Sequence, residues 1–237
     1  MKSKGVLIAV ISLLLGSLSC KNQTGNYLRL VQGLDSYVKT LESEFELISL
    51  ERKALLEELS MFITEEKKSN NEGKVIFICT HNSRRSHMSQ LWAQVAAYYY
   101  NIENIYCYSG GTEATAFNAR AVKALRKAGF EIEQTDSTSN PVYKVKYAGG
   151  AEKVKSFSKK FSNEFNPQKE FIAVMTCSDA DESCPLVPGA QYRVAIPYND
   201  PKISDNTSSE EQIYGERCRQ IAREMFYVFS KVESTLN

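Results

Sequence analysis

The sequence predicts an α/β protein with an open, parallel, four-stranded sheet, helices on both faces of that sheet, and an N-terminal helical extension. Three observations lead to this prediction. Apolar strand-like runs alternate with helical patterns from Lys74 onward, a helical stripe precedes them, and 237 residues suffice for one sizeable α/β core plus an extension. We therefore divide the chain into a signal segment (residues 1–20), a helical extension with a linker (21–70) and a main domain (71–237).

The first twenty residues, MKSKGVLIAVISLLLGSLSC, have the pattern of an export signal. Lys2 and Lys4 precede an apolar run from Val6 to Leu15 that is too short to span a bilayer. Small residues then precede Cys20, which resembles the lipobox of bacterial lipoproteins, although Ser17 stands where such boxes usually carry Leu. A lipidated Cys20 predicts anchoring in the cell envelope, on the periplasmic side of a membrane. An ordinary cleaved signal and an uncleaved anchor are the alternatives, and an unused signal would leave the chain in the cytoplasm.

The extension carries apolar residues at alternating spacings of four and three. They are Leu34, Val38, Leu41, Phe45, Ile48, Leu55, Leu59 and Phe62. The stripe is typical of one or two helices that pack on their own domain, with a coiled coil as the alternative. The polar stretch Glu65–Lys74 is the expected linker to the main domain.

Four apolar runs in the main domain have the length and composition of buried strands. They are KVIFIC from Lys74, NIYCYS from Asn104, EFIAVMTC from Glu170 and YRVAIP from Tyr192. Helical faces are formed by Met88, Leu91, Trp92, Val95, Ala96 and Tyr99, by Ala121, Val122 and Leu125, and by Ile221, Met225, Val228, Phe229 and Val232. Asn118 is the expected N-cap of the second of these helices, and Gly129 its end. An insertion at residues 141–168 is rich in lysine and begins with a strand or hairpin pattern.

Charge and cysteine content narrow the function classes. The 29 basic and 28 acidic residues leave a net charge of +1, so nothing points to nucleic acid. Of the six cysteines, five remain if Cys20 is lipidated. An odd number in an exported protein suggests a free thiol with a chemical role. No His/Cys cluster has the spacing of a zinc site, so we expect no metal and no bound cofactor.

The chemistry is predicted to lie where the strand that begins at Lys74 ends. Cys79 ends that strand, and the polar loop after it leads into a helix. Such a loop presents backbone N–H groups and the positive end of a helix dipole to one point, which makes an anion site. The same donors would stabilise the thiolate of Cys79, and Arg85 supplies a planar fork for two oxygens of a tetrahedral oxyanion. The candidate oxyanion-binding loop comprises Thr80, His81, Asn82, Ser83, Arg84, Arg85 and Ser86.

These residues carry a family resemblance. CTHNSRRS resembles the Cys-x-x-Asn-Ser-x-Arg-Ser loop of the low-molecular-weight protein tyrosine phosphatases and of the thioredoxin-coupled arsenate reductases. The likeness continues through YSGGTEATAFNARAVKALRKAGFEI, VMTCSDADESCPLVPG and YNDPK, whereas residues 1–70 and 141–168 lie outside it. It implies that residues 71–237 form a catalytic domain of this fold, with Cys79 as the nucleophile and Arg85 binding the oxyanion.

The resemblance also assigns roles to three later residues. The stretch CSDADESCP is similar to the segment that carries two relay cysteines in the arsenate reductases, which implies that Cys177 and Cys184 pass a disulfide outward from Cys79. The Asp-Pro pair in YNDP implies that Asp200 is the proton donor. One departure concerns Arg84, which stands where many family members have a second cysteine; its charge is expected to bind oxyanion or a phosphorylated partner.

Three functions follow as hypotheses. The first is an arsenate reductase-like enzyme that uses Cys79, Cys177 and Cys184 in a relay, with a thioredoxin-like protein as the reductant. The second is a phosphatase that hydrolyses phosphate esters through a phosphocysteine at Cys79. The third is a lipoprotein that binds oxyanions without turnover. An oxidising envelope would favour a locked Cys177–Cys184 disulfide, so a reductase located there needs a membrane-linked thiol reductant.

Overall fold

The computed structural model describes residues 29–237, so the signal prediction for residues 1–20 and the lipidation prediction for Cys20 lie outside the described residues. The α-helices are α1 (Gln32–Val38), α2 (Leu50–Asn70), α3 (Arg85–Tyr99), α4 (Ala119–Lys127), α5 (Ser178–Ser183) and α6 (Glu210–Leu236), and two 3₁₀ helices are η1 (Glu42–Leu47) and η2 (Pro201–Ser204). The strands are β1 (Gly73–Cys79), β2 (Ile105–Gly111), β3 (Glu131–Gln134), β4 (Tyr143–Lys146), β5 (Val154–Ser156), β6 (Phe171–Met175) and β7 (Ala190–Ala195).

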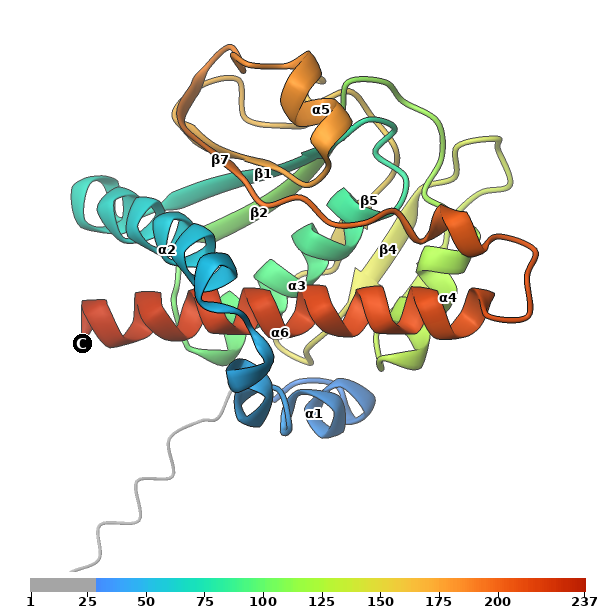
Figure 1. Ribbon diagram of the computed structural model, residues 1–237, viewed down its shortest axis with the longest axis horizontal. Helices are drawn as coiled ribbons and strands as arrows, with labels where there is room; N and C mark the ends of the chain where they lie inside the picture. The colour runs from blue at the N-terminus through green and yellow to red at the C-terminus, as the bar shows by residue number, and fades with distance from the viewer. Residues whose placement is uncertain (1–28) are drawn as a thin grey trace, which may run out of the picture.

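The predicted parallel sheet of four strands is confirmed. Its order is β2-β1-β6-β7, and every neighbouring pair is parallel. From β1 the chain passes through α3 to β2, whereas from β6 it passes through α5 to β7 in the opposite direction (Figure 1). The loops that follow β1 and β6 therefore diverge at the same edge of the sheet, which is the usual position of a binding site in open α/β sheets.

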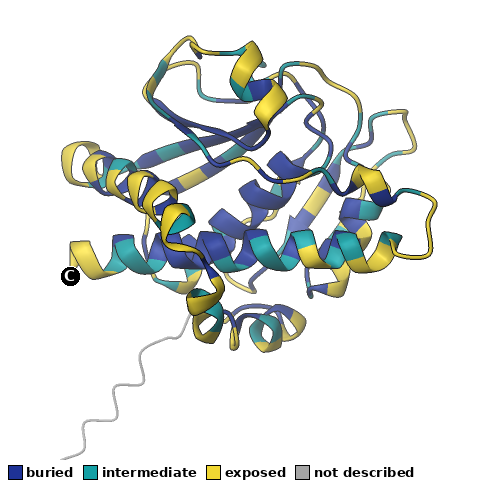
Figure 2. Cartoon of the chain, in the orientation of Figure 1, coloured by how far each residue is buried: buried dark blue, intermediate teal, exposed yellow. Residues whose placement is uncertain are grey.

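Helices cover both faces of the sheet, as predicted, because side chains along each strand alternate between two cores. Val75 and Phe77 of β1 belong to the larger core, which α3 forms with α6 packed behind it. Ile76 and Ile78 belong to a smaller core on the opposite face, closed by α5 and by the chain around Phe161. Strands β1 and β6 are accordingly buried almost throughout, while α2 has an exposed outer side and α6 is exposed only near its two ends (Figure 2).

The N-terminal extension packs against its own chain. Leu34, Val38, Leu41, Ile48 and Leu59 of the predicted stripe are buried in the same core as α3 and α6. The stripe differs from prediction within α2, where Leu56 is fully buried and Leu55 is 37% exposed. The buried face of α2 thus keeps Leu59 but includes Leu56 in place of Leu55, because the helix must meet both α6 and the edge of the sheet.

The predicted linker at Glu65–Lys74 is wrong. Helix α2 continues through Asn70 and buries Glu66 on the way. Asn71 then ends the helix in the left-handed conformation, with φ 54°, and β1 begins at Gly73. The extension is therefore joined to the sheet by a tight turn that fixes the position of α2.

The insertion at 141–168 forms the hairpin that its pattern predicts, and then returns to the parallel sheet. Strands β4 and β5 pair antiparallel, and β3 joins them in a second sheet. Beyond β5 the backbone reaches β2, where Gly111 N donates to Lys159 O at 2.9 Å and Phe161 N donates to Gly111 O at 2.9 Å. This return brings the insertion beside the end of β1, since Gly111 pairs with Cys79.

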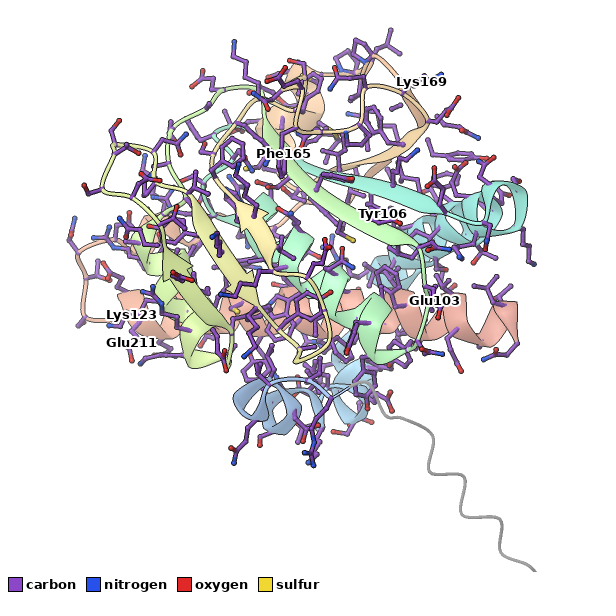
Figure 3. The ribbon with its side chains drawn as sticks, turned by 180° about the vertical axis from the view of Figure 1, so that it is seen from behind. Glu103, Tyr106, Lys123, Phe165, Lys169 and Glu211 are labelled. Atoms are coloured by element: carbon purple, nitrogen blue, oxygen red, sulfur yellow. The ribbon has the colours of Figure 1, made fainter. Side chains whose placement is uncertain are left out.

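The outer edge of β2 is closed by side-chain amides rather than by another strand. Gln94 accepts from Cys107 N at 3.1 Å and donates to Ile105 O at 3.1 Å, and Gln90 donates to Cys107 O at 3.0 Å. Asn166 of the insertion donates to Ser109 O at 3.1 Å. Figure 3 shows this side of the molecule, with Tyr106 on β2 and Phe165 in the insertion. The edge thus offers few unpaired backbone groups to another chain.

Within residues 29–237, no helix combines the length and the apolar character that a membrane crossing requires.

Two neighbouring leucines test the packing of the extension. Leu56→Ala is expected to lower the free energy of unfolding by about 2–5 kcal/mol, because it leaves a cavity in the shared core. Leu55→Ala, the matched control at the surface, should lower it by about 1 kcal/mol or less. Urea denaturation followed by circular dichroism measures both. Similar losses in the two variants would contradict the orientation of α2.

Candidate active site

Cys79 lies at the end of β1, only 3% exposed, with a hydroxyl aimed at its sulfur. Its Sγ is 3.1 Å from Ser86 Oγ. Asn82 Nδ2 donates to the same Ser86 oxygen at 2.9 Å, which leaves the Ser86 proton for the sulfur. Asn82 itself has φ 44°, a conformation that Asn tolerates better than most residues and that turns the chain back toward Cys79.

The loop after Cys79 is held by its carbonyl groups, which point outward. Cys79 O accepts from Thr112 N at 3.2 Å, Thr80 O from Glu113 N at 2.8 Å, His81 O from Ser158 Oγ at 3.0 Å, and Ser83 O from Asn118 N at 2.9 Å. The N–H groups of residues 81–84 donate to no protein group among the described residues. They directly precede the N-terminus of α3, so the loop has unused donors beside the positive end of a helix dipole. This arrangement suits a bound anion.

Two features missed by the sequence analysis support this loop. The Lys159 N–H of the insertion donates to Asn82 Oδ1 at 2.9 Å, so the insertion is part of the loop's framework. Gly111 of β2 packs so closely that a Cβ there would lie 2.7 Å from both Asn82 N and Thr80 O. The pair Gly110–Gly111 was the only sequence signal for this contact, since nothing in 141–168 marks Lys159.

Arg85 and Asp200, which are 115 residues apart, meet beside the loop. Arg85 Nη2 donates to Asp200 Oδ2 at 2.6 Å, and Arg85 Nη1 donates to Tyr198 O at 3.0 Å. The other Asp200 oxygen accepts from Lys202 N at 3.0 Å and caps η2. The guanidinium and the carboxylate are thus paired at the end of the loop, and each has one further group that holds it in place.

Arg84 is the residue directly before α3. Its Nε donates to Tyr214 Oη at 2.7 Å and its Nη2 lies 3.3 Å from Asp205 Oδ2, so its charge is used by α6 and by the segment before it. Tyr214 also donates to Asp205 at 2.7 Å. The side chain is nearly buried and paired, and it anchors the loop to α6. That it binds oxyanion or a phosphorylated partner stays a prediction.

Cys177 and Cys184 stand at the two ends of α5. Cys177 is buried at the N-cap, with its Sγ 3.5 Å from Thr80 Oγ1 of the Cys79 loop. Cys184 is half-buried at the C-cap and packs on the edge of the core that contains Cys79 and Cys177. All five cysteines within 29–237 are unpaired thiols. Two of these, Cys107 and Cys218, are core residues as predicted: burial raises the pKa of Cys218 to about 12 and also raises that of Cys107.

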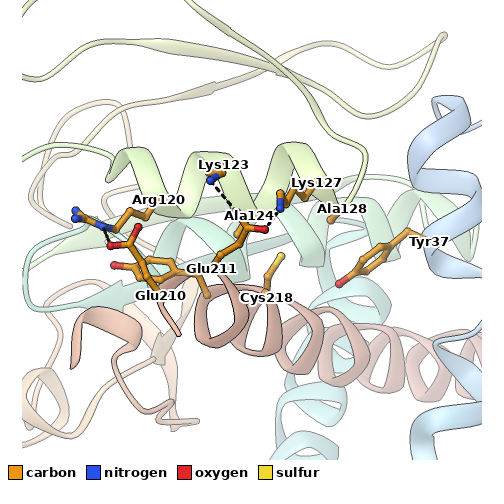
Figure 4. Close-up of a pocket in the computed structure, with 11 residues that line it drawn as sticks. Tyr37, Arg120, Lys123, Ala124, Lys127, Ala128, Glu210, Glu211 and Cys218 are labelled. Carbon is orange, nitrogen blue, oxygen red and sulfur yellow. Dashed lines mark hydrogen bonds and ion pairs between the residues drawn. The ribbon is translucent and has the colours of Figure 1, made fainter. Parts of the chain in front are cut away.

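Other polar groupings lie apart from this site. A cavity of about 210 Å³ lies between α4 and α6, beside ion pairs of Glu211 with Lys123 and Lys127 (Figure 4). None of the predicted site residues lines it. In the described part of the chain, no group of three or more His, Cys, Asp or Glu residues is placed to hold a metal ion.

A family model and the sequence relatives of this chain point to one superfamily. The family model described as low molecular weight phosphotyrosine protein phosphatase matches residues 74–147. An arsenate reductase of Bacillus subtilis is 30% identical over 149 residues, which cover 62% of this chain and 88% of that protein. The chain belongs to the low-molecular-weight protein tyrosine phosphatase superfamily. An arsenate reductase of Brevibacillus brevis is 31% identical over 131 residues, 55% of this chain and 78% of that protein. Within the superfamily the chain is therefore close to the arsenate reductases.

A low-molecular-weight protein tyrosine phosphatase from T. tengcongensis aligns with a TM-score of 0.48 and 15% identity over 68% of this chain and 99% of its own. An arsenate reductase from Archaeoglobus fulgidus aligns with a TM-score of 0.39 and 17% identity over 64% of this chain and 98% of its own. The family assignment rests on the sequence relatives. It makes this superfamily member an enzyme of the phosphatase and arsenate reductase group.

His87 gives this site a pH dependence of stability. The ring is fully buried behind the loop, stacked on Phe117 at 4.0 Å with Nδ1 3.1 Å from Ser109 Oγ. Burial, and secondarily the charge of Lys159, lowers the pKa of His87 well below 6.5. The unfolded chain therefore binds a proton below about pH 6.5 that the folded chain excludes. The free energy of unfolding must accordingly decrease as the pH is lowered through this range.

Between pH 7.5 and pH 5.0 this effect should lower the free energy of unfolding, chiefly below about pH 6.5. The His87→Asn variant is expected to be less stable overall, and its free energy of unfolding should no longer show this part of the pH dependence. The only other histidine, His81, has a half-exposed side chain, so His81→Asn is the control and should keep the slope. Urea titrations at several pH values measure it. An unchanged slope in His87→Asn would show that His87 is not the titrating group.

Proposed function

We propose that the protein is an arsenate reductase-like thiol enzyme, which reduces arsenate to arsenite through Cys79, Cys177 and Cys184. One observation carries the proposal: a second cysteine, Cys177, lies against the Cys79 loop, and a third, more exposed, lies at the far end of the same short helix. Hydrolysis of a phosphate ester has no need of those two thiols. The arsenate reductases at about 30% identity are in line with this reading.

In the proposed reaction, three thiols act in turn. The Cys79 thiolate attacks arsenic and an oxygen leaves as water, so that a sulfur–arsenic bond replaces an oxygen–arsenic bond. The Cys177 thiolate then attacks Cys79 Sγ; the sulfur–arsenic bond breaks and its electron pair leaves with arsenic, which departs as arsenite. Cys184 attacks Cys177 and releases Cys79. A thioredoxin-like dithiol finally reduces the Cys177–Cys184 disulfide with two electrons.

The attack of Cys184 on Cys177 requires α5 to unwind. Seven residues at about 1.5 Å each separate the Cα atoms of Cys177 and Cys184 by about 10 Å, more than the roughly 7 Å that a disulfide spans. Helix α5 is short, and Arg193 holds its second half by donating to Cys184 O at 3.2 Å and to Asp181 O at 2.9 Å. Release of these bonds would free Cys184 to move to Cys177 and then outward to the reductant.

Arg85 and Asp200 would have to separate when the oxyanion binds. Arg85 carries the positive charge that suits two oxygens of arsenate, and its fork is now directed at Asp200. Binding of arsenate to Arg85 would free the Asp200 carboxyl group. In its protonated form it would then deliver the proton to the leaving oxygen.

A phosphatase is the second candidate. The match of residues 74–147 to the phosphatase family model favours it, as does the meeting of Arg85 and Asp200 beside Cys79. Phosphocysteine formation at Cys79 and hydrolysis with help from Asp200 would use these groups alone. Arsenate or a phosphate ester is accordingly the proposed substrate class, and a lipid anchor at Cys20 remains a separate proposal about location.

Arsenite production and aryl phosphate hydrolysis distinguish the candidates. The purified full-length chain, in mild detergent with thioredoxin, thioredoxin reductase and NADPH, is expected to form arsenite over many turnovers. Cys79→Ser should abolish both activities, because both need the nucleophile. Cys184→Ser should form about one arsenite per chain and then stop, because the Cys79–Cys177 disulfide cannot be resolved.

Cys107→Ala, a core cysteine outside the relay, is the control and should resemble the parent. Aryl phosphate hydrolysis that ignores Cys184, without arsenite formation, would establish the phosphatase instead. Oxyanion binding with neither activity would leave the third hypothesis, a binding lipoprotein.

A further inference from the structure

One side chain of the N-terminal extension reaches the framework of the active site. Arg52 of α2 lies with its guanidinium carbon 4.7 Å above the ring of Tyr198. Its Nε and Nη2 donate to Glu224 Oε2 of α6 at 3.0 and 2.8 Å, and the Glu224 side chain is only 3% exposed. Glu224 is in turn held by Gln220, which donates to its other oxygen at 2.9 Å. Arg52 therefore binds in a fixed, largely desolvated geometry.

Tyr198 connects this cation to the catalytic groups. Tyr198 is buried, and its N–H donates to Thr176 O at 3.1 Å. Thr176 is the residue directly before Cys177. Its carbonyl accepts from Arg85 Nη1 at 3.0 Å. Asp200 follows two residues later and accepts from Arg85 Nη2. A shift of the Tyr198 ring would thus move the Tyr198 carbonyl that holds Arg85. It would also move Asp200, which lies two residues further along the chain.

We propose that Arg52 is a positioning residue of this enzyme. Its contact with the ring holds Tyr198 in the position in which Arg85 and Asp200 are oriented for the oxyanion. The inference rests on the proposed function only for what the oxyanion becomes, because oxyanion binding by Arg85 is common to all three hypotheses. It makes the extension a working part of the active site. The matched phosphatase family model begins at residue 74, after the extension.

Arg219 shows what a purely structural contact of the same kind looks like. It also joins the extension to α6: its Nε donates to both oxygens of Glu44 at 3.1 Å, and its guanidinium lies 4.5 Å from the ring of Tyr37. Neither Glu44 nor Tyr37 contacts Arg85, Asp200 or Tyr198 by a hydrogen bond. Arg219 is therefore a matched control for the docking of the extension.

The test uses the full-length chain with three variants. Arg52→Met together with Glu224→Gln removes the cation without leaving a buried, unpaired carboxylate. Arg52→Lys keeps a cation near Glu224 and Tyr198. Arg219→Met is the control. Circular dichroism and urea midpoints establish that each variant is folded at the assay temperature.

The main readout needs no turnover: the affinity for inorganic phosphate, measured as the protection of Cys79 from alkylation by iodoacetamide. The double variant should bind phosphate about tenfold more weakly, whereas Arg52→Lys should come within about threefold of the parent and Arg219→Met should match it. The same order is expected in KM for arsenate or for an aryl phosphate, with a smaller change in kcat.

Parent-like phosphate affinity in the double variant would overturn the proposal, and so would an equal loss in Arg219→Met. The two proposals fail separately. If the parent forms no arsenite, the reductase assignment fails, while the protection assay still decides whether Arg52 positions Arg85.

Discussion

The pairing of β1 with β6 is the constraint on which the rest of the site depends. Thr176 N donates to Ile78 O at 2.7 Å and extends the ladder to the last residues of both strands. Because the chain leaves these strands in opposite directions, the loops after Cys79 and Thr176 separate above the sheet edge. Cys177 is thereby brought to the Cys79 loop from almost 100 residues away. Without this register the second thiol would have no reason to be near the first.

The neighbouring arginines of the loop show how position decides the use of a charge. Arg84 and Arg85 are chemically identical and adjacent, yet Arg84 pairs with Asp205 and donates to Tyr214, while Arg85 pairs with Asp200. Arg84 is the N-cap of α3 with non-helical backbone angles (φ −130°, ψ −80°), whereas Arg85 is the first helical residue, so the two side chains leave the backbone differently. The first anchors the loop to α6. The second meets a carboxylate that an oxyanion can displace.

Much of the fold was predictable because it depends on local patterns. The four strands, the helix that Asn118 caps and the apolar face of α6 each follow from hydrophobic periodicity and capping residues. Periodicity was less informative where a helix contacts several elements. Helix α2 meets α6, β1 and β7, and Phe62 stacks on Tyr192 of β7 at 4.4 Å, so its buried face differs from the single stripe expected for one partner. Likewise the first part of the expected linker, residues 65–70, is polar but helical, since its exposed side faces water while Glu66 is buried.

The sequence by itself determined the chemistry available: a cysteine at a strand end, an arginine six residues later, two further cysteines seven residues apart, and an Asp-Pro turn. Those are local features, and local propensity and covalent spacing suffice to find them. Only the tertiary structure decided how they are used, because strand register and helix packing join residues that no spacing relates. Such contacts place Asp200 on Arg85, Lys159 on Asn82 and Arg52 on Tyr198. Their energies depend on burial and on distances of about 3 Å, which exist only once the chain has closed around them.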